Sequence, residues 1–361
     1  MENSVRHYDW CYISGRVNIL ECSLLSSNFF ERLLSTDDFK DVLANMNNTP
    51  LKPYFTRVKH LYEFEALLDE YYYNRLDEIR SLSPETAVCD FFLLRNDVHN
   101  LKRFIKCKIL GASVDKLFRG TMSRDEWGDV WQDKSTALSE IFRESVSFVK
   151  KVVLQHNHNQ ITPHISPASQ GGDEGGEKEE SLPFIIDLIF DGAYLRYVED
   201  YCKKIEVEII KRYLETYQLM KGLEVIRRAI SLRLDMNLLS QYFMEGFDKG
   251  HVFHKLAKNT VWASEQTVRD VLIETHCKAT LQGLLLSNLS RNISFQYEVA
   301  TDNYLLDMLR PVKYIPFGPE RVFGYLCGLT TEVFNLKLLL GGKVHRVEND
   351  LLRERLRKTY V

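Results

Sequence analysis

Apolar residues recur at three- and four-residue steps through most of the chain. The clearest run begins near Pro84, and its apolar positions are Phe91, Leu94, Val98, Leu101, Ile105 and Ile109. This spacing places them on one face of an α-helix. Gly111 follows the run at a position typical of a helix C-cap. No segment combines period-two alternation with flanking turn residues, so the sequence predicts an all-α protein.

Two further patterns predict helices in the first quarter of the chain. Residues 14–25 form one, with Ile19 on its apolar stripe, and residues 54–79 form another, whose stripe includes Phe64 and Tyr71. Between them, Asp37-Asp38 is a typical N-cap for a short helix that ends near Asn45.

One helical phrase occurs three times at intervals of about 120 residues. It reads Asn-Leu-Lys in two copies and Gly-Leu-Glu in the middle copy, and a Pro-Glu pair precedes both asparagine copies. An aspartate lies about 31 to 33 residues before each copy. Two landmarks that keep nearly one spacing indicate an internal repeat. The landmarks are Asp69, Asn100, Asp191, Gly222, Asp302 and Asn335.

The repeat predicts three similar helical domains, over residues 1–124, 125–246 and 247–361. Each has about the commonest size of a protein domain. A catalytic site is normally needed once, whereas these landmarks recur once per module. We therefore expect them to hold the modules together and predict no catalytic residue.

Residues 156–181 differ from the rest of the chain. They are rich in glycine, proline and charged residues and have little apolar content, which predicts a flexible insertion inside the middle module. His156, His158 and His164 match no defined zinc spacing, so we predict no metal site.

Composition and motifs exclude several classes of function. Acidic and basic residues nearly cancel, 50 against 47, which argues against a general nucleic-acid binder. Seven cysteines without a Cys-x-x-Cys pair indicate free thiols in a reducing compartment. Gly341-Gly342-Lys343 lacks the other residues of a phosphate-binding loop, because Lys337 and Val344 occupy those places. We expect its glycines either to allow two helices to approach closely or to interrupt one helix. No cofactor is predicted, and no apolar run is long enough to span a membrane.

Several phrases together resemble a known family. They are Arg16-Val-Asn-Ile-Leu-Glu, Asp97-Val-His-Asn-Leu-Lys, Asp191-Gly-Ala-Tyr-Leu, Phe317-Gly-Pro-Glu-Arg-Val and the ending Leu352-Arg-Glu-Arg-Leu-Arg-Lys-Thr-Tyr. In this order they resemble the C subunit of the V-type and A-type ATPases, which is homologous to the d subunit of the eukaryotic V-ATPase. The resemblance covers the chain outside 156–181. It departs from the pattern where Gly222 replaces the asparagine and where Asp302-Asn-Tyr304 is one residue short.

The resemblance implies an architecture and a role. Members of this family are funnels of three helical domains around a pseudo-threefold axis, and they are not enzymes. Each is a monomeric rotor adaptor at the cytoplasmic face of the membrane. It joins the central shaft, made of the D and F subunits, to the proteolipid ring for ATP-linked proton or sodium transport. The alternative is a cytosolic helical-repeat scaffold with unrelated protein partners, although modules of about 120 residues are too long for TPR, ankyrin or HEAT units.

Overall fold

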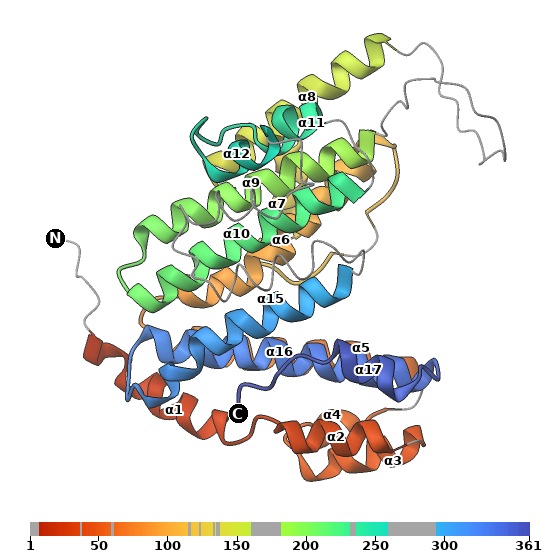
Figure 1. The fold of residues 1–361 in the computed structure, drawn as a ribbon, viewed down its shortest axis with the longest axis vertical. Helices are drawn as coiled ribbons and strands as arrows, with labels where there is room; N and C mark the ends of the chain where they lie inside the picture. Colours follow the sequence, from red (N-terminus) through yellow and green to blue (C-terminus); the bar gives the residue numbers. More distant parts are fainter. Residues whose placement is uncertain are drawn as a thin grey trace. The chain divides into compact units, whose positions relative to one another are not determined.

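The computed structural model describes residues 7–36, 38–58, 61–114, 117–122, 124–132, 134, 138–159, 182–231, 236–258 and 294–361. Within these ranges every regular element is helical and no β-strand occurs, which confirms the all-α prediction (Figure 1). The chain divides into two compact units, and each unit is assembled from segments that are not consecutive in the sequence.

Unit 1 combines residues 1–92, 202–220 and 275–361. Its centre is α16 (Pro319–Val344), the longest helix in the described part of the chain, which packs against α5 and α1 (Figure 1). The other elements contained in this unit are η1 (His7–Trp10), α1 (Cys11–Glu21), α2 (Ser27–Ser35), α3 (Phe39–Asn45), η2 (Met46–Asn48), α4 (Lys52–Phe55), η3 (Leu61–Glu63), α5 (Phe64–Leu82), α15 (Ser294–Leu309), η5 (Arg310–Tyr314) and α17 (Asn349–Arg355).

Polar contacts attach the start of α16 to α1. The Gly318 N–H donates to Ser14 Oγ at 3.1 Å. Arg321 donates from Nε to Asn18 Oδ1 at 2.8 Å and forms a buried ion pair with Glu21. Gly318 has a φ of +143°, a value that residues with a side chain rarely adopt, which explains a glycine directly before the helix. The first and last parts of the chain thus share one core.

The last six residues, 356–361, form a C-terminal strap within unit 1. The Lys358 N–H donates to Asn303 Oδ1 at 2.6 Å, and the Lys358 ammonium pairs with Asp307 at 2.6 Å. Tyr360 lies in a notch over Gly324 and Gly328, where an added Cβ at Gly328 would come within 2.8 Å of the tyrosine. The two glycines leave the space that the ring occupies.

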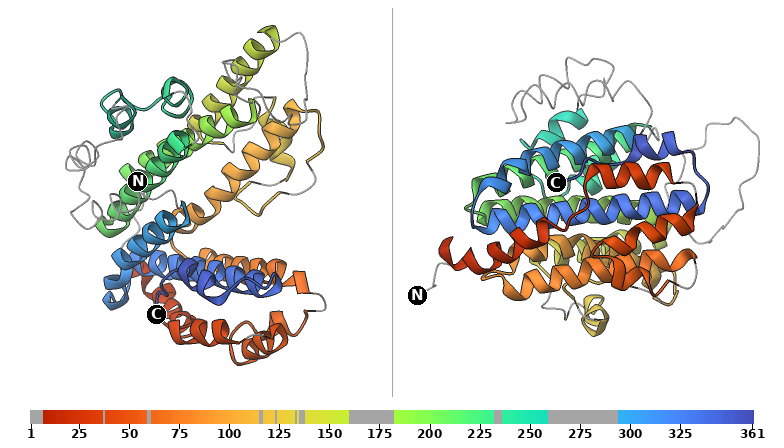
Figure 2. Two further views of the ribbon diagram at one scale, coloured as in Figure 1. Left: turned by 45° about the vertical axis from the view of Figure 1, so that its right-hand side comes forward. Right: turned by 90° about the horizontal axis from the view of Figure 1, so that it is seen from below.

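Unit 2 combines residues 93–201 and 221–274. It contains α7 (Arg124–Val130), α8 (Glu140–Asn159), α11 (Met236–Leu238), the single π-helical turn η4 (Leu239–Phe243) and α12 (Val252–Lys258). Three long helices have residues in both units, and most of α6 and α9 belongs to unit 2. These helices are α6 (Ala87–Ile109), α9 (Leu182–Lys204) and α10 (Glu208–Ser231), and Figure 2 shows them in two further views.

Several local predictions are confirmed. The Asp38 carboxylate accepts a hydrogen bond from the Lys40 N–H at 2.8 Å and caps α3, while Asp37 lies outside the described residues. Helix α6 ends at Ile109, and Gly111 follows with a φ of +66°. An added Cβ at Gly342 would come within 2.3 Å of Leu352, so this glycine does allow α16 and α17 to approach closely.

Other local predictions are wrong. The predicted helix over 54–79 is divided into α4, η3 and α5, because α4 folds back and places Tyr54 against Tyr71 of α5 with ring centroids 5.5 Å apart. Helix α6 begins at Ala87, three residues after Pro84. Ile19 is 64% exposed and does not belong to the core. Helix α8 continues through 156–159, which the composition assigned to the insertion, and 160–181 lies outside the described residues. The division into three modules stays a prediction.

Candidate functional site

The two asparagine landmarks hold backbone in the same way. Asn100 Nδ2 donates to the Phe118 carbonyl, and Asn100 Oδ1 accepts from the Phe118 N–H, both at 2.8 Å. Asn335 makes the same pair of hydrogen bonds with the backbone of Arg357, both at 2.9 Å. Each asparagine side chain is almost fully buried, and we call each arrangement an amide clamp. A buried amide with both polar atoms satisfied orders the segment that it holds.

At Gly222, the landmark in the middle copy of the phrase, an aromatic ring takes the place of a side chain. An added Cβ at Gly222 would lie 2.0 Å from Phe253 Cζ, so the phenylalanine occupies the volume that a side chain would need. Phe253 belongs to a cluster with Phe243, Phe247 and His251, whose ring centroids lie 4.6–5.7 Å from that of Phe253. Apolar packing therefore replaces the amide clamp at this position.

Two aspartate landmarks bind the lysines of the repeated phrase. Lys102, two residues after Asn100, pairs with Asp191 in unit 2. Lys337, two residues after Asn335, pairs with Asp69 in unit 1 at 2.6 Å. These pairs join segments 89 and 268 residues apart. In each pair, an aspartate landmark thus binds the lysine that follows an asparagine landmark, although the two residues lie far apart in the sequence.

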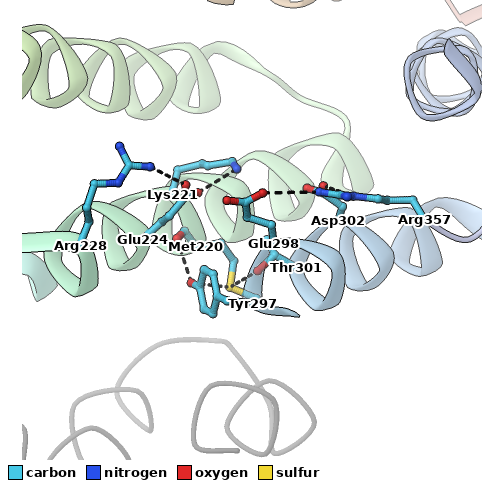
Figure 3. A network of polar contacts seen from close by, with 9 residues as sticks. All are labelled: Met220, Lys221, Glu224, Arg228, Tyr297, Glu298, Thr301, Asp302 and Arg357. Carbon is cyan, nitrogen blue, oxygen red and sulfur yellow. Dashed lines mark hydrogen bonds and ion pairs between the residues drawn. The ribbon is translucent and has the colours of Figure 1, made fainter. Parts of the chain in front are cut away.

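Asp302, the third aspartate landmark, has a different partner, shown in Figure 3. Arg357 donates from Nε to Asp302 at 2.9 Å, and its guanidinium lies 3.7 Å from Glu298. In the same unit, the Tyr297 hydroxyl donates to the Met220 carbonyl at 2.9 Å. Arg357 thus joins Asp302 to the clamp of Asn335.

Glu224 takes the place of the lysine in the middle copy. Its carboxylate binds Lys221 at 3.0 Å and Arg228 at 3.3 Å, within one helix (Figure 3). An acid here cannot attract an aspartate, so the lysine–aspartate pair of the other copies has no counterpart at this residue.

Sequence reasoning missed two buried carboxylates that precede the asparagines by three residues. Asp97 accepts from the Thr121 N–H at 3.0 Å and from the Thr121 hydroxyl at 2.7 Å. Glu332 accepts from the Leu25 N–H at 2.5 Å and from the Tyr71 hydroxyl at 3.2 Å. Burial raises the pKa of Glu332 to about 7, although these hydrogen bonds oppose the shift. The sequence contains one signal for these two acids, because each lies one helical turn before an asparagine landmark.

No metal-binding group of three or more histidine, cysteine or acidic side chains occurs within the described ranges. His156 and His158 lie in α8, and His164 lies outside the described residues.

A hollow of about 650 Å³ in unit 2 is lined by α6, α9 and α10, and five of its lining residues carry cationic or imidazole side chains.

Comparison with known proteins decides the family. The family model described as ATP synthase (C/AC39) subunit matches residues 13–355. The chain belongs to this family. A relative named as the C subunit of an A-type ATP synthase, from Methanocaldococcus jannaschii, is 20% identical. The alignment is 372 residues long including gaps, and it covers 96% of this chain and 86% of the relative. A relative named as the C subunit of a V-type sodium ATPase, from Enterococcus hirae, is 21% identical over 350 residues, which cover 94% of this chain and 95% of the relative.

Membership of this family confirms the resemblance found in the sequence and makes the chain a non-catalytic subunit of the V/A-type ATPase class. Among the described helices, none combines the length and the apolar character that crossing a bilayer requires.

Proposed function

We propose that this chain is the central-stalk rotor adaptor of a V/A-type ATPase. It joins the shaft of the D and F subunits to the proteolipid ring at the cytoplasmic face of the membrane. Torque then passes between shaft and ring and couples ATP chemistry to proton or sodium transport. The observation that carries this proposal is the match to the ATP synthase (C/AC39) subunit family over residues 13–355.

The internal contacts agree with a part that must transmit torque. Such a part needs stiffness, which densely packed interiors supply. Within unit 1, the first helix and the last long helix are joined by a buried ion pair, and the strap returns along α16 to an amide clamp. Each clamp fixes backbone with two hydrogen bonds rather than one.

We also propose that the three modules form the pseudo-threefold funnel of the family, with boundaries near residues 124 and 246. The first and third modules support this proposal, because their asparagines form the same clamp and their lysines both bind an aspartate landmark. Superposing the segments that follow Asn100 and Asn335 in an experimental structure tests it. Helices that fail to coincide would contradict the repeat.

Co-purification from native membranes tests the function. We expect a tagged chain to travel with the proteolipid and with the D and F subunits after mild detergent extraction. The purified chain should also bind the detergent-solubilised ring and the D–F shaft in separate assays. A chain that binds neither and stays in the soluble fraction would favour the helical-repeat scaffold instead.

A further inference from the structure

The hollow in unit 2, which we call the basic groove, has a volume of about 650 Å³ and is lined by residues of three helices. Lys102, Arg103 and Lys106 of α6 lie along one wall, Asp187 of α9 along another, and Arg228 of α10 on the third. All of its lining residues belong to unit 2. One turn of α6 separates Lys102 from Lys106, about 6 Å at 1.5 Å per residue. The groove therefore presents several cations along the length of a helix.

Its charge is positive even though the chain as a whole is acidic. Four lysine and arginine side chains line it against two aspartates, whereas the net charge of the chain is −3. The aspartates are already paired with Lys102 and Lys106. Arg228 binds Glu224 at 3.3 Å, and Arg103 binds no acid among the described residues. Positive charge thus remains for a partner to neutralise.

The imidazole of His99 lines the same groove, beside these cations. Burial lowers its pKa most, and the neighbouring cations Lys102, Arg103 and Arg95 lower it further. A nearby cation disfavours protonation of an imidazole because the charges repel.

The rest of the groove is apolar. Leu188 and Ala229 line it and are buried, while Phe184 and Val225 are partly exposed. Leu110, at the end of α6, is 71% exposed. An isolated phosphate would leave this apolar surface uncovered, whereas a helix with one apolar stripe and acidic flanks would match both the floor and the rim.

We propose that the basic groove binds an acidic amphipathic helix of another protein of the ATPase complex. Leucine-like side chains at three- and four-residue steps would cover Leu188 and Phe184. A carboxylate on one flank of that helix would pair with Arg103, and a carboxylate on the other would share the 60% exposed Arg228 with Glu224. The inference rests on the proposed function, because it takes the partner from the same complex.

Site-specific photo-cross-linking in the assembled complex tests the groove. A benzoylphenylalanine at position 110 replaces the exposed Leu110, and the same group at position 154 replaces Leu154, which is 60% exposed on α8 and does not line the groove. We expect the probe at 110 to attach to a helical segment of another protein of the complex, with acidic residues beside an apolar stripe. The probe at 154 should not attach to that segment.

A charge reversal adds a second measurement. Arg103→Glu should lower the yield of the cross-link from position 110 about tenfold, because it replaces an attraction with a repulsion at the rim. Arg143→Glu makes the same change of net charge at an exposed residue of α8 outside the groove and should leave the yield unchanged. Thermal unfolding of both variants checks that the fold is intact.

The possible outcomes separate the two proposals. Adducts with lipid, with another segment of this chain or with a basic segment would overturn the groove proposal, and so would an equal yield for Arg103→Glu. If the chain co-purifies with the complex under those outcomes, the proposed function survives. A chain that does not co-purify at all would contradict the proposed function and the groove together.

Discussion

The side-chain amide of Asn335 binds the backbone of Arg357 through both of its polar atoms. It donates to the carbonyl and accepts from the N–H, each at 2.9 Å. Asn100 binds Phe118 in the same way in the other unit. Leucine has a similar size but cannot make either bond. At position 335 it would leave a buried carbonyl and a buried N–H without their partners, and at position 100 it would leave a partly buried pair.

We expect Asn335→Leu and Asn100→Leu each to lower the free energy of unfolding by roughly 1–3 kcal/mol. Urea denaturation of the purified chain measures this change. Asn74→Leu on α5 is the matched control, since Asn74 is exposed and makes one hydrogen bond at 3.2 Å with Tyr54; it should change stability by less than about 0.5 kcal/mol. A clamp variant that is fully stable but no longer binds the ring would make that asparagine an interface residue.

At Gly222, an alanine should be destabilising. Its Cβ would lie 2.0 Å from a ring atom of Phe253, and displacing a packed ring costs about 1–3 kcal/mol. This exceeds the gain of up to about 1 kcal/mol that alanine brings to a helix interior. Chemical denaturation of Gly222→Ala measures the balance.

Gly15→Ala is the control for this prediction, because nothing lies within 4 Å of its added Cβ. It should leave stability unchanged or raise it by up to about 1 kcal/mol. Phe253→Leu combined with Gly222→Ala should cost less than the two single losses added together. Strict additivity would mean that the ring and the glycine do not interact.

Glu332 predicts a specific dependence of stability on pH. Its pKa is about 7 in the folded chain and near 4.5 when unfolded, so the fold favours the protonated acid. The stabilisation is fully present below pH 4.5 and is lost as the pH rises to 7 and beyond. The loss reaches at most about 3 kcal/mol, at about 1.36 kcal/mol for each pKa unit.

Comparison of the parent with Glu332→Gln from pH 4.5 to 8 isolates this carboxyl from other titrating groups such as Glu21, whose pKa is also raised by burial. We expect the stability of the parent relative to the glutamine variant to fall over this range. Glu65→Gln, on the exposed surface of α5, is the control for the substitution itself. Parallel pH profiles for the parent and Glu332→Gln would show that the buried acid does not titrate there.

The pairing of Lys337 with Asp69 should give a modest coupling energy. The two side chains are 34% and 41% exposed, so a double-mutant cycle with Lys337→Met and Asp69→Asn should yield about 0.5–1 kcal/mol. This coupling should weaken in about 1 M salt, which screens exposed charges. The more exposed pair Arg212–Glu208 should give less than about 0.5 kcal/mol. Equal coupling in both pairs would show that the landmark pair has no special role.

Local signals were enough to predict the parts of the fold that depend on neighbouring residues. Asp38 caps α3 through the N–H two residues later, and Gly111 ends α6 through its positive φ. Both effects act within one helical turn, where the sequence contains all the information. The predicted helix over 54–79 failed because Tyr54 packs against Tyr71, a tertiary contact that no local pattern shows.

The landmarks were recognised by their spacing, but their partners were not. Nothing local indicates that Asn335 binds Arg357 or that Lys337 reaches Asp69, 268 residues away. The sequence shows that Gly222 replaces the asparagine, whereas the reason for the glycine, the ring of Phe253, lies on another helix. The periodicity of apolar residues identifies which face of a helix is buried, but it does not identify the residues that pack against that face.

The bond from the Leu25 N–H to Glu332 spans 307 residues. A ribosome adds roughly 5–20 residues per second, so α1 and α2 leave the exit tunnel roughly 15 to 60 s before the helix that completes their core. During that interval α1 has no α16 beside it, and the buried residues Phe29, Phe30 and Leu33 belong to an α2 that still lacks its neighbour α17. The newly made α1 and α2 are therefore natural clients for chaperones, and the synthesis of α16 and α17 is the event that ends this exposure.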